Sequence, residues 1–486
     1  MKKILITHSY FLRFDPKQWA TAKPYAPLGT LYGAAVLQQN GYAVSFFDTM
    51  FSHNAEEIIP VLGRERPDIF IIYDDGFNYL TKMCLTNMRD AAFKMTRFAK
   101  EINCTVIFSS SDSTDHFESY LDNGADYVII GEPEATLLKL VEAIGNNYTD
   151  FSSIDGLAFK LKGNLIKTKR AVVLRELDSI PFPAWDMIDM APYKKMWMKS
   201  SGYFSMNMAT TRGCPFKCNW CAKPIYGNRY NSRSPENVVA ELKMLKEKFN
   251  FDHIWFCDDI FGLKPGWVNE FADRLQQQNL KIRFKIQARA DLLADKFEIS
   301  ALSRAGCDTV WMGAESGSQK ILDAMDKGTT IAQIETSTRL MRENGIKPCF
   351  FIQFGYPGET KEDINLTIKM INTLLPDELG ISVSYPLPGT VFYENVKSEL
   401  KQKANWSDSN ELVLMFQNTY QPAFYRQLHR YVHKTYRKHL AFENLKKMFL
   451  NPLKTDGITL KRAMSSIYYL PSAMINKFKL NKLEKR

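Results

Sequence analysis

Short apolar runs alternate with helix-like segments along most of this 486-residue chain, in two separate blocks. In the first block, residues 1–148, the runs predict five strands: Lys3–Thr7, Ala43–Phe47, Ile69–Ile72, Thr105–Phe108 and Tyr127–Ile130. Helix-like patterns such as Gly29–Gln39 and Leu85–Glu101 lie between them. Because strands joined through helices form parallel sheets with helices on both faces, we expect an α/β domain with a doubly wound, Rossmann-like or flavodoxin-like sheet.

The alternation begins again in the second block, residues 201–398. Six further strands are predicted: Phe204–Thr210, His253–Cys257, Arg283–Gln287, Thr309–Gly313, Pro348–Phe354 and Leu379–Ser384. The helical patterns between them are Glu236–Phe249, Gly266–Gln277, Lys296–Ala305, Ile331–Asn344 and Lys361–Leu374. Six βα units indicate a partial (β/α)6 barrel of the TIM type, whose chemistry gathers in the loops after the strands.

Two other regions complete the predicted organisation. Residues 149–200 are predicted to be a linker that contains a hairpin, Leu157–Lys162 with Leu165–Thr168. The two prolines of Ile180–Ala184 exclude a helix there. Residues 399–486 are predicted to form a basic helical C-terminal region.

The positive charge is concentrated in that C-terminal region. Residues 401–486 hold 17 Lys and Arg against 5 Asp and Glu, which gives +12, while the whole chain carries +10. In residues 425–440, apolar side chains share one helical face and basic side chains the opposite face: Leu428, Val432, Tyr436 and Leu440, against Arg426, Arg430, Lys434 and Arg437. This helix is expected to cover the barrel mouth; the alternative is peripheral contact with an anionic membrane or a phosphorylated lipid. No nucleic-acid partner is expected, because no RNA-binding module is recognisable.

The composition predicts a cytoplasmic protein. Hydrophobic residues make up 45% and charged residues 24% of the chain, as in soluble globular proteins. No apolar run reaches the length of a membrane span. Met1–Tyr10 superficially resembles a signal peptide, but its apolar stretch ends at His8, so we interpret it as the first strand.

The eight cysteines fall into two groups. Five occur singly, where buried free thiols are expected: Cys84, Cys104, Cys257, Cys307 and Cys349. The other three, Cys214, Cys218 and Cys221, fall within eight residues directly after the first strand of the second block. In a reducing compartment such clustering indicates a metal rather than disulfides.

The spacing of Cys214, Cys218 and Cys221 suits an iron–sulfur cluster with one open iron. Three thiolates at intervals of four and three residues can bind one [4Fe–4S] cubane and leave its fourth iron free to bind a small molecule. Clusters that only transfer electrons have four cysteine ligands. The alternative is a structural zinc site completed by a distant histidine, for which His253 is the nearest candidate.

This Cys-x-x-x-Cys-x-x-Cys motif, at the end of the first strand of a βα barrel, resembles that of the radical S-adenosylmethionine (SAM) superfamily. Four further segments resemble one subgroup of it: Arg233–Glu236, Asp258–Phe261, Gly313–Ser318 and Gly355–Glu359. That subgroup joins an N-terminal cobalamin-binding domain to a radical SAM barrel, and it includes anaerobic porphyrin-ester cyclases and hopanoid-modifying enzymes. The resemblance covers about residues 1–400.

The resemblance implies a 4Fe-4S cluster, SAM and cobalamin as cofactors. The residues it implies for SAM lie at the strand ends: Asp258, Asp259, Gln287, Arg289, Glu315, Gln353 and Gly355. Arg289 is expected at the SAM carboxylate and Glu315 at the ribose hydroxyls. Asp258 and Asp259 stand where the superfamily often has Gly-Gly-Glu, so the alternative for them is a solvated pair that caps a helix. Residues Gln353 to Glu359 are expected near the adenine of SAM. The alternative for Glu359 is that it opens the next helix, where acidic residues are favoured.

For cobalamin, the resemblance implies residues in the loops after the first, fourth and fifth strands: Thr7, Ser109, Ser111, Gly131 and Glu132. The Asp-x-His-x-x-Gly motif of proteins with an axial histidine is absent around His8, as it usually is in this subgroup. The alternative is a doubly wound domain that has lost the cofactor and only packs on the barrel. Tyr356 and Tyr385, at the ends of strands five and six, are candidates for returning a proton or hydrogen atom.

The resemblance therefore favours a cobalamin-dependent radical SAM enzyme that methylates, or closes a ring at, an unactivated carbon of a biosynthetic intermediate. The expected partners are a small-molecule or lipid-like substrate and an electron donor such as flavodoxin or ferredoxin. One alternative is a radical SAM enzyme without cobalamin that catalyses a rearrangement or dehydrogenation. A methylthiotransferase is disfavoured, because its N-terminal domain needs three more cluster cysteines. A zinc-stabilised binding module without catalytic activity is the alternative from another class.

Overall fold

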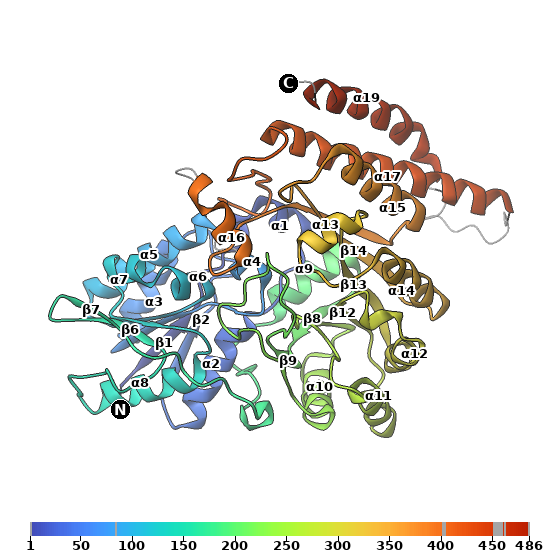
Figure 1. Ribbon diagram of the computed structural model, residues 1–486. Coiled ribbons are helices and arrows are strands. Elements are labelled where there is room, and N and C mark those ends of the chain that lie inside the picture. Colours follow the sequence, from blue (N-terminus) through green and yellow to red (C-terminus); the bar gives the residue numbers. More distant parts are fainter. Residues whose placement is uncertain (1, 83–84, 401–404, 451–459, 461–462, 485–486) are drawn as a thin grey trace.

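The computed structural model describes residues 2–82, 85–400, 405–450, 460 and 463–484, so that Cys84 lies outside the described residues. An N-terminal α/β layer, a half-barrel and a pair of C-terminal helices follow one another along the chain (Figure 1). Shorter helices connect the larger elements: α1 (Pro16–Thr21), α4 (Tyr79–Lys82), α6 (Ser111–Asp115), α7 (Phe117–Asp122), α9 (Ala191–Ser201), α13 (Gln319–Ala324) and α16 (Val391–Val396).

The N-terminal sheet has the predicted five parallel strands, in the order β2-β1-β3-β4-β5. They are β1 (Ile4–Thr7), β2 (Val44–Phe47), β3 (Ile69–Tyr73), β4 (Thr105–Ser109) and β5 (Tyr127–Ile129). Successive side chains of a strand enter different cores, because they point to opposite faces of the sheet. Ile69 and Ile71 pack with α2 (Leu28–Gln39) and α8 (Glu134–Gly145), whereas Phe70 and Ile72 pack with α3 (Ile58–Glu65) and α5 (Thr86–Glu101). This is the doubly wound arrangement that the sequence predicts.

The hairpin expected within the linker belongs to this same sheet. Its strands, β6 (Leu157–Leu161) and β7 (Asn164–Lys167), continue the sheet beyond β5 in antiparallel orientation. Leu157 and Phe159 are buried. The hairpin therefore extends the N-terminal layer to seven strands.

The second sheet is a half-barrel of six parallel strands, which confirms the predicted partial barrel. They are β8 (Ser205–Met208), β11 (His253–Phe256), β12 (Phe284–Ala288), β13 (Cys307–Glu315), β14 (Lys347–Phe354) and β15 (Glu378–Val383). Helices lie along the outside of the half-barrel (Figure 1): α10 (Pro235–Phe249), α11 (Trp267–Gln277), α12 (Lys296–Ala305), α14 (Ile331–Glu343) and α15 (Lys361–Leu374). The first predicted strand is shorter than expected, because β8 ends at Met208. The following β9 (Thr211–Arg212) pairs with β10 (Asn231–Ser232) outside this sheet.

Two helices, α17 (Pro422–Leu450) and α19 (Ser466–Glu484), form the C-terminal region, as predicted. The apolar face of α17 is buried at Leu428, Val432 and Tyr436, and the Tyr436 hydroxyl donates to the carbonyl oxygen of Pro376 at 2.6 Å. α17 therefore packs near the start of β15, and α19 lies along its outer side (Figure 1). No helix in the described part of the chain is both long and apolar enough to cross a membrane.

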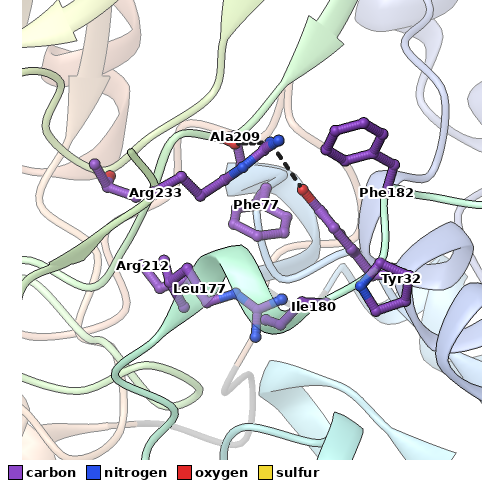
Figure 2. Close-up of a pocket in the computed structure, with 10 residues that line it drawn as sticks. Tyr32, Phe77, Leu177, Ile180, Phe182, Ala209, Arg212 and Arg233 are labelled. Atoms are coloured by element: carbon purple, nitrogen blue, oxygen red, sulfur yellow. Dashed lines mark hydrogen bonds between the residues drawn. The ribbon is translucent and has the colours of Figure 1, made fainter. Parts of the chain in front are cut away.

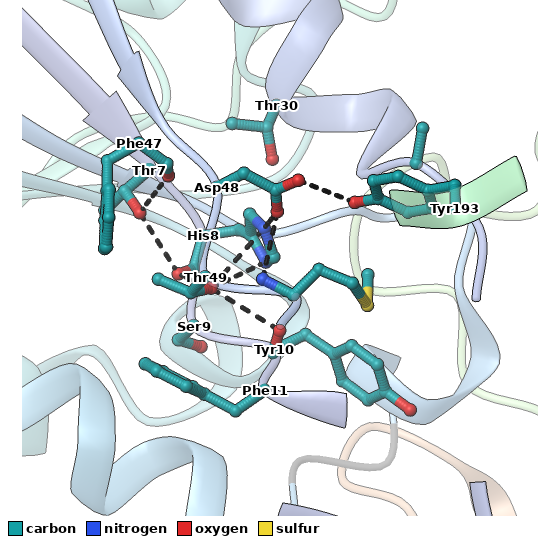
Figure 3. A network of polar contacts seen from close by, with 12 residues as sticks. Thr7, His8, Ser9, Tyr10, Phe11, Thr30, Phe47, Asp48, Thr49 and Tyr193 are labelled. Carbon is teal, nitrogen blue, oxygen red and sulfur yellow. Dashed lines mark hydrogen bonds and ion pairs between the residues drawn. The ribbon is translucent and has the colours of Figure 1, made fainter. Parts of the chain in front are cut away.

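A buried polar network ties the N-terminal sheet to the linker (Figure 3). His8 follows β1, and its Nε2 lies 2.8 Å from Oδ1 of Asp48, which follows β2. The other carboxylate oxygen of Asp48 accepts a hydrogen bond of 2.8 Å from the hydroxyl of Tyr193 in α9. Thr49 Oγ1 lies 3.2 Å from His8 Nδ1, so both ring nitrogens already have partners.

We expect Tyr193→Phe to lower the free energy of unfolding by roughly 1–3 kcal/mol, because it leaves a carboxylate oxygen of Asp48 without its donor. Thermal and urea unfolding would measure the change. Tyr148→Phe is the matched control, since Tyr148 is 60% exposed. Equal stability of the two variants would contradict a structural role for the network.

Candidate active site at the cysteine loop

The three clustered cysteines lie in one loop at the carboxyl end of the half-barrel. The β9–β10 pair closes this loop on both sides. Gly213 has a φ of +78°, and a Cβ atom on it would lie 2.5 Å from the carbonyl oxygen of Arg229. Cys214, Cys218 and Cys221 are half-buried and form no disulfide. Burial raises the pKa of the Cys214 thiol above its usual value, so its thiolate needs a positive partner such as a metal.

Asn219, within the cysteine loop, anchors that loop to the rest of the half-barrel. Its backbone N–H donates to the carbonyl oxygen of Met325 at 3.1 Å, and its Nδ2 donates to that of Ala324 at 2.7 Å. Its own carbonyl oxygen accepts from the N–H of Phe392 in α16 at 2.9 Å. The sequence analysis missed this residue. Only its position between Cys218 and Cys221 could have drawn attention to it.

The two tyrosines proposed as hydrogen donors are both buried and already hydrogen-bonded. The hydroxyl of Tyr356 donates to Oδ1 of Asn219 at 2.9 Å, so it supports the cysteine loop directly. The hydroxyl of Tyr385 lies 3.4 Å from Oδ1 of Asn405, and its ring packs edge-on against Trp406. Tyr356 is therefore bonded directly to the cysteine loop.

Arg289, predicted to bind SAM, lies against the cysteine loop. Its Nη1 is 3.6 Å from the sulfur of Cys218, and its guanidinium group stacks 3.8 Å from the ring centre of Phe216. Its Nε is 2.9 Å from Oδ1 of Asp291, and its Nη2 donates to the carbonyl oxygen of Lys327 at 2.6 Å. The structure thus places a positive charge beside one of the three thiols.

Glu315, also predicted to bind SAM, ends β13 in a buried ion pair. Its Oε1 lies 2.7 Å from Nζ of Lys327, and both side chains are almost fully buried. Burial by itself would lower the pKa of Lys327, but the charge of Glu315 raises it overall. Glu315 has a φ of +55°, an uncommon backbone conformation that tends to occur at functional sites. Gly313 leaves room for this pair, because a Cβ on it would lie 2.6 Å from both charged atoms.

The Asp258–Asp259 pair divides into two different roles. Asp258 is buried, and its Oδ1 accepts from the N–H groups of Thr210 and Thr211 at 2.7 and 2.9 Å. Burial raises its pKa to about 6, against the opposing effect of these hydrogen bonds. Asp259 is exposed, and its charge acts on Cys214. Asp258 therefore holds the backbone that leads into the cysteine loop, and Asp259 is the member of the pair near the thiols.

The remaining residues predicted for SAM lie on neighbouring strands. Gln287 is half-buried on β12. Gln353 is buried on β14, and its Nε2 donates to Oγ of Ser384 at 2.9 Å. The N–H of Gly355 donates to Oε2 of Glu359 at 2.6 Å. The structure brings these residues to the carboxyl side of the half-barrel, near the loop that holds the cysteines.

Glu359 ends the Gly355–Glu359 segment of the family resemblance, and the sequence left open whether it lies near the SAM adenine or opens the next helix. The capping residue of α15 is Thr360, so Glu359 lies before the helix and is fully buried. Its Oε1 has no hydrogen-bond partner among the described residues. Burial raises the pKa of its carboxyl group to about 8.

Two buried glutamates of the N-terminal domain bind the residue that precedes the cysteine loop. Arg212 lies 2.6 Å from Glu132 and makes two contacts of 3.0 and 2.7 Å with Glu134. All three side chains are 3–4% exposed. The guanidinium group also lies over the rings of Tyr32 and Tyr226, at 5.4 and 5.2 Å. The loop that the resemblance assigned to cobalamin is thus in direct contact with the half-barrel.

Figure 2 shows Arg212 beside a cavity of about 10 Å3 that Tyr32, Phe77 and Phe182 also line. A second arginine, Arg233, reaches the same cavity and donates to the carbonyl oxygen of Ala209 at 3.0 Å. The linker segment that contains Phe182 therefore lines this cavity together with residues of the N-terminal domain and of the half-barrel.

The other residues predicted for cobalamin lie at the carboxyl edge of the N-terminal sheet. Thr7 donates its hydroxyl to the carbonyl oxygen of Phe47 at 2.7 Å, and the carbonyl oxygen of Ser109 accepts from the N–H of Asp74 at 2.8 Å. Gly131 has a φ of +85°. Ser111 is buried, and its Oγ lacks a partner among the described residues.

A second small cavity lies between this edge and the half-barrel. His8 and Asp75 line it from the N-terminal sheet, and Asn207 and Cys257 line it from the half-barrel. Asn207 is buried, and its Oδ1 has no partner in the part of the chain that the structure describes. The cavity measures about 10 Å3, which is enough for about one water molecule.

The geometry is unfavourable for the zinc alternative. His253 begins β11, pairs in register with Ser205 at the start of β8, and bonds to its Oγ at 2.9 Å. The cysteines instead follow the carboxyl ends of these strands. Within the described residues, no three His, Cys, Asp or Glu side chains form a group that could hold a single metal ion. An iron–sulfur cluster does not need three side chains at a single metal ion, because each thiolate binds a different iron.

Comparison with known proteins agrees with this site. Residues 208–371 match the family model described as "Radical SAM superfamily". This segment contains the cysteine loop, Arg289 and Glu315. The chain therefore contains a radical SAM domain, which is built around the loop described above.

The chain is also similar in sequence to two kinds of known protein. The chain is 27% identical over 387 residues to an uncharacterized methyltransferase of Pyrococcus horikoshii, which covers 78% of this chain and 80% of that protein. It is 26% identical over 391 residues to the anaerobic magnesium-protoporphyrin IX monomethyl ester cyclase of Cereibacter sphaeroides, over 78% of this chain and 62% of the cyclase. The chain thus spans less than two thirds of that cyclase.

Among solved structures, the fold is similar to that of OxsB, a cobalamin-dependent S-adenosylmethionine radical enzyme determined with aqua-cobalamin bound. The TM-score is 0.75 at 15% identity, over 98% of this chain and 72% of OxsB. This likeness covers the N-terminal sheet as well as the half-barrel, and it concerns the fold alone.

We expect Arg212→Met to lower the free energy of unfolding by roughly 3–5 kcal/mol, because it leaves two buried carboxylates without their partner. Arg339→Met is the matched control. It breaks an ion pair with Glu343 whose two side chains are 57% and 52% exposed, so its effect should stay below about 1 kcal/mol. Urea unfolding measures both, and similar losses in the two variants would disprove a special role for Arg212.

We expect Glu359→Gln to remove a pH dependence of stability between about pH 5 and pH 8. The pKa of Glu359 is raised to about 8 in the folded chain, so the folded state keeps a proton that the unfolded state loses in this range. Wild-type stability therefore falls as the pH rises, and the variant should lack that part of the fall. Unfolding midpoints at several pH values test this, and parallel curves for both proteins would refute it.

Proposed function

We propose that this chain is a cobalamin-dependent radical SAM enzyme in which Cys214, Cys218 and Cys221 hold a 4Fe-4S cluster. The reaction we propose is methylation of, or ring formation at, an unactivated carbon of a biosynthetic intermediate. The observation that carries the proposal is the cysteine loop itself. Three half-buried thiols lie in a loop fixed by Asn219 at the carboxyl end of a half-barrel, with the guanidinium of Arg289 beside them.

When bound, the cluster would supply the electron that cleaves SAM into methionine and a 5′-deoxyadenosyl radical. The side chains around the loop match the polar groups of SAM. Arg289 can bind the carboxylate, Glu315 the ribose hydroxyls, and the backbone opened by Gly355 the adenine edge. Asp259, exposed beside Cys214, is the acid positioned to accept the amino group.

A segment after the half-barrel shields the adenine side of the proposed site from water. Leu414 and Phe416 are buried, and Nδ2 of Asn418 donates to the carbonyl oxygen of Gly355 at 2.5 Å. A dry site protects a reactive radical from side reactions with solvent. This arrangement supports radical chemistry more than hydrolysis.

Cobalamin binding is supported by the chemistry where the N-terminal sheet faces the half-barrel. Ser111 and Asn207 each bury a polar atom that has no partner among the described residues, and buried polar groups normally have one. Thr7, Ser109, Ser111 and Gly131 would hold the cofactor at the edge of this sheet. Because the cavity beside Asn207 takes only about one water molecule, binding requires the N-terminal sheet and the half-barrel to move apart there.

A radical SAM enzyme without cobalamin is the second candidate, and two observations favour it. The carboxylate of Glu132, assigned to cobalamin by resemblance, is already paired with Arg212. The interface cavity is also far smaller than a corrin ring. Such an enzyme would use the adenosyl radical alone for rearrangement or dehydrogenation. In both versions we propose a small-molecule or lipid-like substrate, and flavodoxin or ferredoxin as the electron donor.

Replacement of Cys214, Cys218 and Cys221 by alanine should abolish iron and sulfide binding and the release of 5′-deoxyadenosine from SAM. Cys307→Ala is the matched control, because Cys307 is a buried thiol outside the loop. The protein is reconstituted anaerobically with iron, sulfide and cobalamin and then given a reductant and SAM. Iron and sulfide content, bound cobalamin and released 5′-deoxyadenosine are measured. Iron and 5′-deoxyadenosine without bound cobalamin would favour the second candidate, and 5′-deoxyadenosine from the triple variant would disprove the cluster assignment.

We expect Glu315→Gln to weaken SAM binding roughly tenfold or more, because a charge-assisted hydrogen bond is lost. The iron content should stay at the wild-type level. Equilibrium binding of SAM to the reconstituted protein, with iron analysis of the same samples, tests this. Glu343→Gln, on the surface of α14, serves as the control, and unchanged SAM affinity in Glu315→Gln would remove this residue from the site.

A further inference from the structure

The outward face of α19 exposes a continuous apolar stripe. Ile467, Met474 and Phe478 are 78%, 68% and 72% exposed, and their spacing of seven and four residues places them on one side of the helix. Ile475 widens the stripe at 54% exposure. Contiguous exposed apolar surface of this kind marks an interaction site, whereas single exposed hydrophobic residues are common.

This stripe is not the surface by which α19 packs on the protein. Ala473 and Leu480, on the opposite side of the helix, are buried. Gln427 of α17 donates through Nε2 to the carbonyl oxygen and Oδ1 of Asn476, at 3.0 and 2.9 Å. α19 therefore has two apolar sides: one packs on α17, and the other is exposed.

The charge around the stripe indicates an anionic partner. Lys477, Lys479 and Lys482 are exposed next to it. α17 and α19 together hold 10 Lys and Arg (seven plus three) against two Glu. A second copy of the chain would bring lysines of the same sign together across the stripe. An anionic surface would instead neutralise them.

We propose that α19 lies on the surface of an anionic lipid bilayer, with Ile467, Met474 and Phe478 inserted and its lysines at the headgroups. Interfacial helices combine an apolar face with flanking Lys and Arg, and they bury the apolar face at the level of the headgroups and upper acyl chains. Phe449 and Leu450, at the end of α17, are each 78% exposed and add to the apolar surface of this region. Figure 1 shows α19 at the outer boundary of the molecule, where a flat surface can reach it.

Co-sedimentation of the full-length protein with lipid vesicles tests this proposal. Wild type should bind vesicles of phosphatidylcholine mixed with phosphatidylglycerol and bind pure phosphatidylcholine vesicles much less. The triple variant Ile467→Ser, Met474→Ser, Phe478→Ser should bind the anionic vesicles roughly a hundredfold more weakly, because it removes three inserted side chains. Replacing Lys477, Lys479 and Lys482 with Gln should weaken binding roughly fivefold for each lysine, with less dependence on salt.

A matched control removes equally exposed apolar side chains elsewhere. Ile59, Val172 and Phe297 are 46%, 80% and 83% exposed on other parts of the molecule, and their replacement with Ser should leave vesicle binding unchanged. Circular dichroism verifies that both triple variants fold. Three outcomes would overturn the proposal: wild type that does not bind anionic vesicles, equal loss in both triple variants, or a wild-type dimer that the α19 triple variant converts to a monomer. The last outcome, measured by light scattering, would assign the stripe to self-association.

Discussion

The pairing of Arg212 with Glu132 and Glu134 is the contact on which the relation between the two sheets depends. Burial of a charge without a partner costs several kcal/mol, so three buried charges can persist only if all of them stay in place together. Glu132 lies in the loop after β5, Glu134 begins α8, and Arg212 is the residue before Gly213. The position of the first cysteine relative to the N-terminal domain is therefore set by an ion pair two residues away.

Polar side chains, rather than hydrophobic packing alone, hold the cysteine loop in place. Asp258 accepts hydrogen bonds from the backbone that enters the loop, and Asn219 binds the backbone of two other elements from within it. Tyr356 in turn donates to Asn219. A site held by such supporting contacts is formed before its ligand arrives, which reduces the ordering needed on binding.

The periodicity of the sequence predicted both sheets because it depends on burial along each strand, which is a local property. All five N-terminal and all six half-barrel strands lie where the apolar runs indicate. The hairpin of residues 157–168 was also found, but its pairing with β5 was not, because strand partners depend on residues that are distant in sequence. The early end of the first barrel strand at Met208 is another such case, since Thr211 and Arg212 pair with β10 rather than with the barrel.

Individual site residues were less predictable than strands for the same reason. The spacing of the cysteines indicates a cluster site, and the positions of Arg289 and Glu315 at strand ends indicate ligand-binding residues. The partners of a side chain, however, come from elsewhere in the chain. Asp258 and Glu132 have the residue types of cofactor ligands, yet their carboxylates are engaged by Thr210 and Arg212. Asn219 and Glu359 show the converse, because ordinary residue types acquire special environments only in the folded chain.

The ion pair between the domains also defines what can be exchanged between related proteins. A chimera that keeps this N-terminal domain but takes its half-barrel from another protein keeps Glu132 and Glu134, and it needs an arginine at the position of Arg212 to pair them. Because each charge is tolerated in the interior only in the presence of the others, these three positions must be exchanged together, although Arg212 is 80 residues from Glu132 and 78 from Glu134. A domain boundary placed in the linker therefore divides the sequence, but the two parts it divides still depend on each other through this ion pair.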